Sequence, residues 1–370
     1  MLLLWCQKIK SLAQPEAQNE YLPGGRHRLG VNLPTKLVFK RLPVVPEPEE
    51  LLIRAFRHGS KAASGIKLSG RPLEVAKRRE AKRIEVMSKT VRTALTNLVA
   101  GTPSLSNLPP FYRELVATLV DVDTSRKSLG AIDGTAKVVG NLERDHLRRL
   151  RFAKSPDETS AIRRQAYGRI SSVVRRAGVH LTFLREAAVK LTGIPSVYVD
   201  IPTIVITGYP NVGKTTLLKQ LTSSEPEIAP YPFTTRGLKL GFFEEGHVRY
   251  QVIDTPGLFD RPFEKRNPIE RQAIAALSNL ADLVVFILDP SETCGYELKG
   301  QIRLLEDIGK TFTDIEVLVV ANKADLVSEN KMTIVREFCR DVIFISAATG
   351  QGVTELKKLV IKLLGRIPNL

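Results

Sequence analysis

Apolar residues in the first half of the chain recur at steps of three and four, which is the spacing of one face of an α-helix. The clearest stretch spans residues 72–100, where Ile84, Met87, Val91 and Leu95 fall on one stripe. Further helices are predicted to begin at Pro48 and to cover residues 111–122, 125–152, 160–177 and 181–191. Short links separate these segments, so residues 46–192 are predicted to form an all-α bundle. Residues 1–45 show weak periodicity and several prolines, and are interpreted as an irregular N-terminal arm.

The pattern changes after residues 193–202, which contain Gly193 and Pro195 and are expected to form a linker. Beyond this linker, short β-branched runs alternate with amphipathic stretches. Predicted strands cover residues 203–207, 238–243, 248–253, 283–288, 317–321 and 342–345, and predicted helices cover 214–222, 269–280, 297–308, 329–339 and 352–364. This alternation is typical of an α/β domain with a mostly parallel, doubly wound sheet, here over residues 203–370.

A glycine-rich turn joins the first predicted strand to the first predicted helix of this domain. It reads Gly208-x-x-x-x-Gly213-Lys214-Thr215 and matches the phosphate-binding loop (P-loop) in its strand–turn–helix setting. Backbone N–H groups and the helix N-terminus attract phosphate oxygens there. Lys214 is expected to reach the β- and γ-phosphates, and the Thr215 hydroxyl to hold Mg²⁺. The residues expected to bind nucleotide in this loop are Gly208, Asn211, Val212, Gly213, Lys214, Thr215 and Thr216.

Polar residues after two later strands indicate which base the site selects. Ligands of such sheets bind beyond the carboxyl ends of the strands. Asn322-Lys323-Ala324-Asp325 follows one of these strands. The Asp325 carboxylate is suited to accept from two N–H groups of guanine, which adenine does not present, while Asn322 holds neighbouring loops and Lys323 lies along the base. Ser346, Ala347 and Ala348 follow the last strand, and a backbone N–H of this segment is expected to meet the guanine O6.

Two further segments are expected to sense the γ-phosphate. Asp254-Thr255-Pro256-Gly257 follows a predicted strand. There Asp254 is expected to hold Mg²⁺ through water, and the Gly257 N–H to meet the γ-phosphate. The segment from Tyr231 to Thr235 contains two adjacent threonines, one of which is expected to complete the Mg²⁺ shell when GTP is bound.

Charge is unevenly placed along the chain, which has a net charge of +16. Residues 1–200 carry 35 Lys and Arg against 18 Asp and Glu, whereas residues 201–370 carry 20 against 21. We therefore expect the helical half to bind a polyanion. The scarcity of interleaved aromatic residues favours structured RNA over single strands. The alternatives are a solvated helix face and an anionic membrane surface. The candidate RNA-binding residues are Arg78, Arg79, Arg83, Arg148, Arg149, Arg151, Arg163 and Arg164.

Cysteine usage and hydropathy exclude other classes. Cys6, Cys294 and Cys339 are far apart, which argues against a disulfide or zinc framework. No apolar run has the length of a membrane span, and the first residues lack the pattern of a secretory signal. These features predict a cytoplasmic protein without a membrane partner.

The motifs together resemble one family. The stretches GYPNVGKTT, YPFTTR, DTPGLFDRPFEKRNPIE, NKAD and SAA, followed by LDPSETCGYEL, resemble the Nog (nucleolar GTP-binding protein) family of Obg-related translational GTPases. The helical region, from LPVVPEPEELL through PPFYRELV, is similar as well, and the chain looks like an archaeal-type member. The resemblance implies a GTPase of large ribosomal subunit assembly that binds GTP, GDP, Mg²⁺ and ribosomal RNA. It also implies Thr235 as the Mg²⁺ ligand, and Lys214, Thr235 and Gly257 as catalytic residues.

One position departs from the common small GTPases. Many of these place a glutamine just after Asp-x-x-Gly to orient the attacking water. This chain has Leu258 there, so intrinsic hydrolysis is expected to be slow and to need a partner or a cation. Asn211 occupies the position where some potassium-activated GTPases hold K⁺, and the alternative for this side chain is that it only stabilises the loop. Two hypotheses remain: a GTP-hydrolysing switch, and a GTP-loaded RNA-binding scaffold with negligible turnover. Either is expected to act as a monomer.

Overall fold

The computed structural model describes Phe39 and residues 42–66, 69–222, 225–232, 237–259, 266 and 268–365. Most of the predicted N-terminal arm lies outside these residues, as does Thr235. The chain divides into two compact units, with the boundary between Ile194 and Pro195. This boundary falls within the predicted linker. The predicted fold class is confirmed, because an all-α bundle precedes an α/β domain.

The first unit consists of helices whose ends follow from local sequence. The helices are α2 (Pro48–Ser64), α3 (Pro72–Gly101), α4 (Pro110–Leu119), α5 (Val122–Arg151), α6 (Pro156–Arg176) and α7 (Gly178–Thr192), with a 3₁₀ turn at Leu105–Asn107. Three of the helices begin on a proline that is followed by acidic residues in the first turn, which suits the helix dipole. The predicted break near residue 124 is wrong by a few residues. Asp121 caps α5, because its carboxylate accepts from the Thr124 N–H at 3.0 Å.

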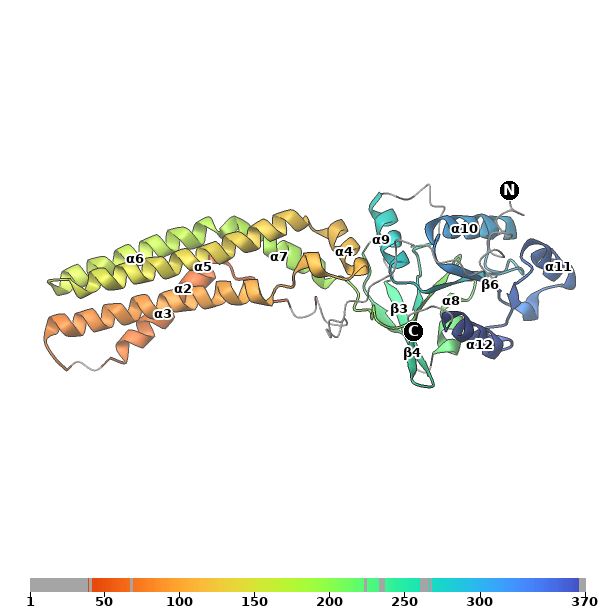
Figure 1. The fold of residues 1–370 in the computed structure, drawn as a ribbon, viewed down its shortest axis with the longest axis horizontal. Helices are drawn as coiled ribbons and strands as arrows, with labels where there is room; N and C mark the ends of the chain where they lie inside the picture. The colour runs from red at the N-terminus through yellow and green to blue at the C-terminus, as the bar shows by residue number, and fades with distance from the viewer. Residues whose placement is uncertain are drawn as a thin grey trace, which may run out of the picture. The chain divides into compact units, whose positions relative to one another are not determined.

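One apolar core joins the long helices, which lie side by side in Figure 1. The buried stripe of α3 predicted from the sequence is present, and Ile84, Met87, Val91 and Leu95 are fully buried. Met87, Val91 and Leu95 pack in one cluster with residues from α2, α5, α6 and α7, including Leu51, Ile132, Ile170 and Leu181. Burial at these positions stabilises the bundle by roughly 1.5–3 kcal/mol per large apolar side chain.

The second unit is a seven-stranded sheet in the order β2-β3-β4-β1-β5-β6-β7. The strands are β1 (Thr203–Thr207), β2 (Glu227–Ala229), β3 (Leu238–Glu245), β4 (Val248–Asp254), β5 (Leu283–Leu288), β6 (Glu316–Ala321) and β7 (Ile343–Phe344). The strands β4, β1, β5, β6 and β7 are parallel to one another, whereas β3 pairs antiparallel with both β2 and β4. The sequence did not predict β2, because three residues with exposed Glu227 carry no period-two pattern.

Helices cover both faces of this sheet, as Figure 1 shows. They are α8 (Lys214–Leu221), α9 (Pro268–Ser278), α10 (Leu298–Thr311), α11 (Glu329–Phe338) and α12 (Val353–Leu364). Leu217 on α8 and Leu356 on α12 pack in one cluster with Ile204 and Val285 of the strands. Alternate strand residues such as Val205 and Phe286 are equally buried and point to the opposite face. This arrangement brings the carboxyl ends of β1, β4, β5 and β6 to one edge.

Candidate functional site

At two positions of the loop after β1, the backbone has a conformation that only glycine adopts readily. Gly208 has a φ of 139° and Gly213 a φ of 103°. A Cβ at Gly213 would lie 2.1 Å from Asn322 Nδ2, and a Cβ at Gly208 would lie 2.6 Å from the Ile287 carbonyl oxygen. Both substitutions therefore require the loop to move. The two glycines allow the P-loop to lie close to β5 and to the loop after β6.

Lys214, the first residue of α8, closes this loop. Its side chain is 7 % exposed, and its ammonium donates to the carbonyl oxygens of Gly208 (2.8 Å) and Tyr209 (2.7 Å). An ammonium held in the concave side of the loop lies where phosphate oxygens bind in such loops. Asn211, with a φ of 62°, and Thr216 are exposed at the same loop.

Asp254, at the end of β4, lies beside Thr215. The Thr215 hydroxyl donates to Asp254 Oδ2 at 2.6 Å, and the Lys239 ammonium donates to Thr215 Oγ1 at 3.0 Å. Burial raises the pKa of Asp254 above its usual range, against the hydrogen bond from Thr215 and the positive charges of Lys214 and Lys239.

These residues fit a divalent cation. Asp254 is fully buried, and its Oδ1 has no hydrogen-bond partner among the described residues. A buried carboxylate oxygen is costly unless it is paired with a cation or a donor. Thr215 supplies a second hard oxygen, and oxygen ligands are those that Mg²⁺ prefers. Thr215 and Asp254 are the two predicted Mg²⁺ ligands that the structure describes.

Asn322, which follows β6, joins the phosphate loop to the expected base loops. Its side-chain Nδ2 donates to the Val212 carbonyl oxygen at 2.8 Å, and its Oδ1 accepts from the Ala347 N–H at 2.8 Å. The Ser346 N–H is also occupied, because it donates to the Gln351 carbonyl oxygen. Among the described residues, the Ala348 N–H has no such partner. It is therefore the N–H of this segment best suited to meet a ligand oxygen.

Lys323 and Asp325 lie on the same short turn. Lys323 has a φ of 61°, and Asp325 is exposed within the 3₁₀ turn Ala324–Leu326. The Lys323 ammonium pairs with Asp289 Oδ2 at 2.6 Å and donates to Thr293 Oγ1 at 2.8 Å. The predicted base-binding residues Asn322, Asp325 and Ala348 thus come together with Lys323 beside the phosphate loop.

Sequence reasoning missed the role of Asp289, which follows β5. Its fully buried carboxylate accepts from Lys323 and from the Cys294 N–H. The backbone N–H of Asp289 donates to Gln301 Oε1 at 2.7 Å. Burial acts to raise the pKa of Asp289, but the Lys323 ammonium and the Ser291 donors outweigh it and hold the pKa below its usual range. An acid at the end of a parallel strand was the available signal. Asp289 positions Lys323.

The predicted γ-phosphate segment is described in part. Gly257 has a φ of 80° and is exposed, whereas Leu258 is only 6 % exposed. Thr235 lies outside the described residues. Leu258 is buried and apolar, so its side chain has no group that could orient water.

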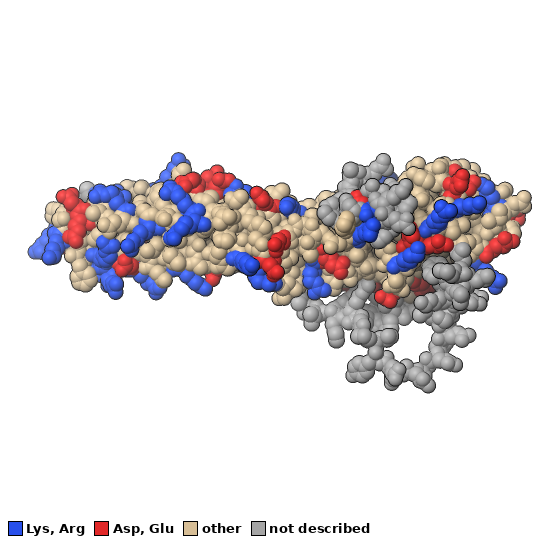
Figure 2. Space-filling view, turned by 90° about the horizontal axis from the view of Figure 1, so that it is seen from above, with Lys and Arg blue, Asp and Glu red and all other residues tan. Residues whose placement is uncertain are grey.

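The basic bundle holds the candidate RNA-binding residues in two settings. Arg83 and Arg163 pair with Glu80, which is 7 % exposed, at 2.8 and 2.7 Å. These two arginines therefore neutralise a buried acid inside the bundle. The remaining candidates are the exposed Arg78, Arg148, Arg149, Arg151 and Arg164 and the half-buried Arg79. Figure 2 shows Lys and Arg side chains gathered along the bundle, with fewer acidic ones between them.

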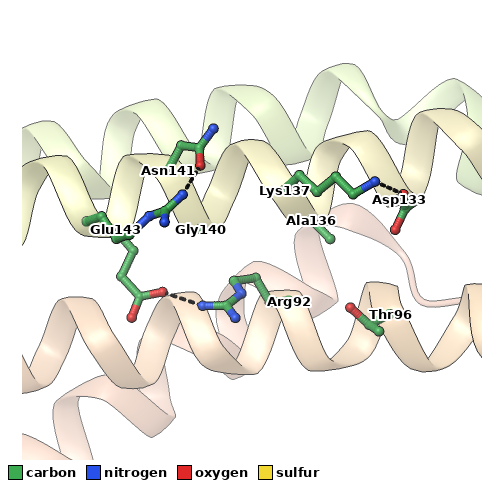
Figure 3. Close-up of a pocket in the computed structure, with 9 residues that line it drawn as sticks. Arg92, Thr96, Asp133, Ala136, Lys137, Gly140, Asn141 and Glu143 are labelled. Carbon is green, nitrogen blue, oxygen red and sulfur yellow. Dashed lines mark hydrogen bonds and ion pairs between the residues drawn. The ribbon is translucent and has the colours of Figure 1, made fainter.

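Two adjoining hollows of about 400 and 480 Å³ lie between α3 and α5. Arg92 and Glu143 line both of them and pair across the gap at 2.9 Å (Figure 3). Lys137 pairs with Asp133 at 2.7 Å in the same region. The charges of Arg92 and Lys137 in this region are therefore offset by Glu143 and Asp133.

Two family models match the chain. Residues 39–198 match the NOG1 N-terminal helical domain, and residues 268–325 match nucleolar GTP-binding protein 1 (NOG1). The fold and the site define a GTP-binding protein of the P-loop GTPase class. More particularly, the chain belongs to the Nog family of nucleolar GTP-binding proteins.

The chain is also similar to individual proteins. An uncharacterized protein of Methanocaldococcus jannaschii is 40% identical over 295 residues, which cover 80% of this chain and 83% of that one. Nucleolar GTP-binding protein 1 of Drosophila melanogaster is 30% identical over 328 residues, which cover 86% of this chain but only 50% of the relative. The chain thus spans about half the length of that relative. A crystal structure of a nucleolar GTP-binding protein 1 from Plasmodium falciparum is 32% identical, covering 46% of this chain and 90% of that one, with a TM-score of 0.41.

Within the described residues, no helix combines the length and the apolar composition needed to cross a bilayer.

Proposed function

We propose that this protein is a GTP-hydrolysing switch that binds ribosomal RNA through its helical bundle during assembly of the large ribosomal subunit. The observation that supports GTP most directly is Asn322, which bonds to the phosphate loop on one side and to the segment after β7 on the other. It thereby couples recognition of phosphate to recognition of the base. Asp325 selects guanine, because its carboxylate accepts from two N–H groups that adenine lacks.

The proposed reaction is attack of water on the γ-phosphorus, with the bond to the β-phosphate oxygen breaking. Lys214 and the loop N–H groups hold the phosphate oxygens and offset the negative charge that develops there. The Gly257 N–H binds a γ-phosphate oxygen. Thr215 and, through water, Asp254 would hold Mg²⁺, which would supply positive charge at the phosphates; by resemblance, Thr235 would join them in the GTP state.

Slow turnover follows from Leu258, which is buried and has no polar group. We propose that the missing positive charge comes from the bound ribosomal particle or from K⁺ held near Asn211, whose exposed side chain carries an amide oxygen. Replacing K⁺ by Na⁺ at constant ionic strength then lowers turnover, and Asn211→Ala removes the difference. Equal rates of the wild type in both salts would rule out the K⁺ site and leave the particle as the activator.

The second candidate function is an RNA-bound scaffold that keeps GTP without hydrolysing it. Leu258 favours this candidate as well, since it is apolar and stands where many small GTPases carry a glutamine. Adding immature large subunits distinguishes the two functions. A switch hydrolyses GTP faster on the particle, whereas a scaffold retains GTP there.

Structured RNA is the proposed partner of the bundle because α5 and α6 carry the exposed Arg148, Arg149 and Arg164, and Figure 2 shows more Lys and Arg than Asp and Glu along the bundle. Charge reversal at Arg148, Arg149 and Arg164 in the full chain should weaken RNA binding and leave GDP affinity unchanged. Phosphate binding releases counterions, so the slope of log affinity against log salt should fall by about one for each arginine that no longer binds a phosphate. Filter binding to double-helical RNA at several salt concentrations measures both quantities.

The matched control reverses three exposed lysines of the other unit, Lys219, Lys299 and Lys310. This variant has the same net charge and should bind RNA as the wild type does. If both variants lose affinity equally, net charge alone drives binding and the bundle is not the RNA-binding unit.

A further inference from the structure

Lys239 places a positive charge beside the two residues assigned to Mg²⁺. It lies on β3, opposite Asp254 in the antiparallel register with β4. Its ammonium donates to Thr215 Oγ1 at 3.0 Å, and the same hydroxyl donates to Asp254 Oδ2 at 2.6 Å. Lys239 is half-buried as a residue.

We propose that Lys239 is an internal cation that occupies the Mg²⁺ position of the nucleotide-free site and that Mg²⁺ must displace. This role depends on the Mg²⁺ site of the proposed function. It adds that the chain carries its own competitor for that ion.

The charge of Asp254 explains why a lysine lies there. Its carboxylate is fully buried, and burial of a carboxylate is unfavourable unless a cation or donors compensate. Two ammonium groups face it, those of Lys214 and Lys239. Lys214 has a second task, because it lies in the phosphate loop and is expected to bind the phosphates. Lys239 has no such task, so its charge serves the Thr215–Asp254 pair.

Competition follows from the hydrogen bonds of Thr215. Its oxygen accepts from Lys239 and donates to Asp254. A hydroxyl oxygen has two lone pairs, and one of them accepts from Lys239, so a metal ion would use the other. Mg²⁺ and the Lys239 ammonium would then lie on the same oxygen, where two cations repel each other. Binding of Mg²⁺ at Thr215 is therefore favoured when the Lys239 ammonium moves away.

Two consequences concern the nucleotide cycle. Lys239 lowers the affinity for Mg²⁺, because the ion must release a bonded ammonium before it binds. Because the binding of Mg²⁺ and of nucleotide is linked, Lys239 weakens Mg²⁺-dependent nucleotide binding by the same factor by which it lowers the affinity for Mg²⁺. Once Mg²⁺ leaves, Lys239 returns and stabilises the empty site, which favours release of GDP.

The test compares full-length Lys239→Met with Lys357→Met. Lys357 lies on α12, where its ammonium is 4.7 Å from the Phe243 ring, so both variants lose one lysine charge from the same unit. Binding of fluorescent GDP is measured while Mg²⁺ is titrated from excess chelator to millimolar levels. Lys239→Met should reach half-maximal tightening at about five- to tenfold lower Mg²⁺ than the wild type. Lys357→Met should behave as the wild type does.

An unchanged or higher Mg²⁺ requirement in Lys239→Met overturns the competition, while the wild-type titration still stands as evidence for the Mg²⁺ site. If the wild type binds GDP without any dependence on Mg²⁺, the proposed function fails and this role of Lys239 fails with it.

A measurement on the wild type covers the case in which Lys239→Met does not fold. A lysine-acylating reagent and mass spectrometry report how accessible Lys239 is. Its labelling should rise when Mg²⁺ is added to the GDP-bound protein and should stay low with GDP and chelator. Equal labelling with and without Mg²⁺ would contradict displacement.

Discussion

Replacing Lys214 by alanine should lower the rate of GTP hydrolysis by about 100-fold or more, since removal of one preorganised donor to a developing negative charge commonly costs that much. The reason lies in the phosphate loop, where the Lys214 ammonium is 2.7–2.8 Å from two loop carbonyl oxygens and is almost fully buried. No other lysine of the described P-loop residues 208–216 replaces it. Single-turnover hydrolysis of radiolabelled GTP measures the loss.

Affinity gives a second readout of the same variant. Lys214→Ala should weaken binding of a GTP analogue more than binding of GDP, because the ammonium offsets the charge of the γ-phosphate. Lys219→Ala is the matched control on the same helix, where Lys219 is exposed and pairs with Glu225 at 3.0 Å. It should leave both affinities unchanged. If Lys214→Ala weakened the binding of both nucleotides equally, Lys214 would not interact with the γ-phosphate.

Asp325→Asn should weaken GTP binding by at least about tenfold, the usual effect of removing a bidentate hydrogen-bond pair to a base. Asp325 is exposed on the turn after β6, beside Asn322 and Lys323. Its carboxylate accepts from the guanine N1–H and from the 2-amino group. An amide at this position has its own N–H donors, which suit the second carbonyl oxygen of xanthine. The variant should therefore keep or gain affinity for xanthosine triphosphate.

Competition against fluorescent GDP with GTP, ATP and xanthosine triphosphate measures this preference. Asp307→Asn, on α10 and paired with Lys310, is the matched control and should prefer GTP as the wild type does. Unchanged GTP affinity in Asp325→Asn would mean that the base lies elsewhere.

The parts that the sequence predicted well are those in which one local pattern determines the structure. The stripe through Ile84, Met87, Val91 and Leu95 specifies the buried face of α3, because the helical repeat leaves those side chains on one side. The order of β-branched strands and amphipathic helices likewise specifies the parallel sheet. The motif from Gly208 to Thr215 likewise predicts the turn that it forms, because its two glycines lie where the backbone has a positive φ.

The parts that the sequence did not predict depend on contacts between distant segments. Asp289 and Lys323 are 34 residues apart and meet only because β5 and β6 are adjacent in the sheet. Lys239 reaches Thr215 through the pairing of β3 with β4. The excess of positive charge also led to the prediction that Arg83 and Arg163 bind RNA. In the folded bundle both arginines pair with the buried Glu80, a contact between α3 and α6 that the number of charges does not reveal.

The central claim is that this site binds and hydrolyses guanine nucleotide. Its most direct test is a single-turnover assay with excess full-length protein, Mg²⁺ and K⁺, run in parallel on GTP and ATP. We expect GTP hydrolysis at an intrinsic rate on the order of 10⁻³ s⁻¹ or lower, as in GTPases without an activator, and no hydrolysis of ATP. Hydrolysis of ATP at the same rate as GTP, or the absence of GTP hydrolysis with and without immature large subunits, would contradict it.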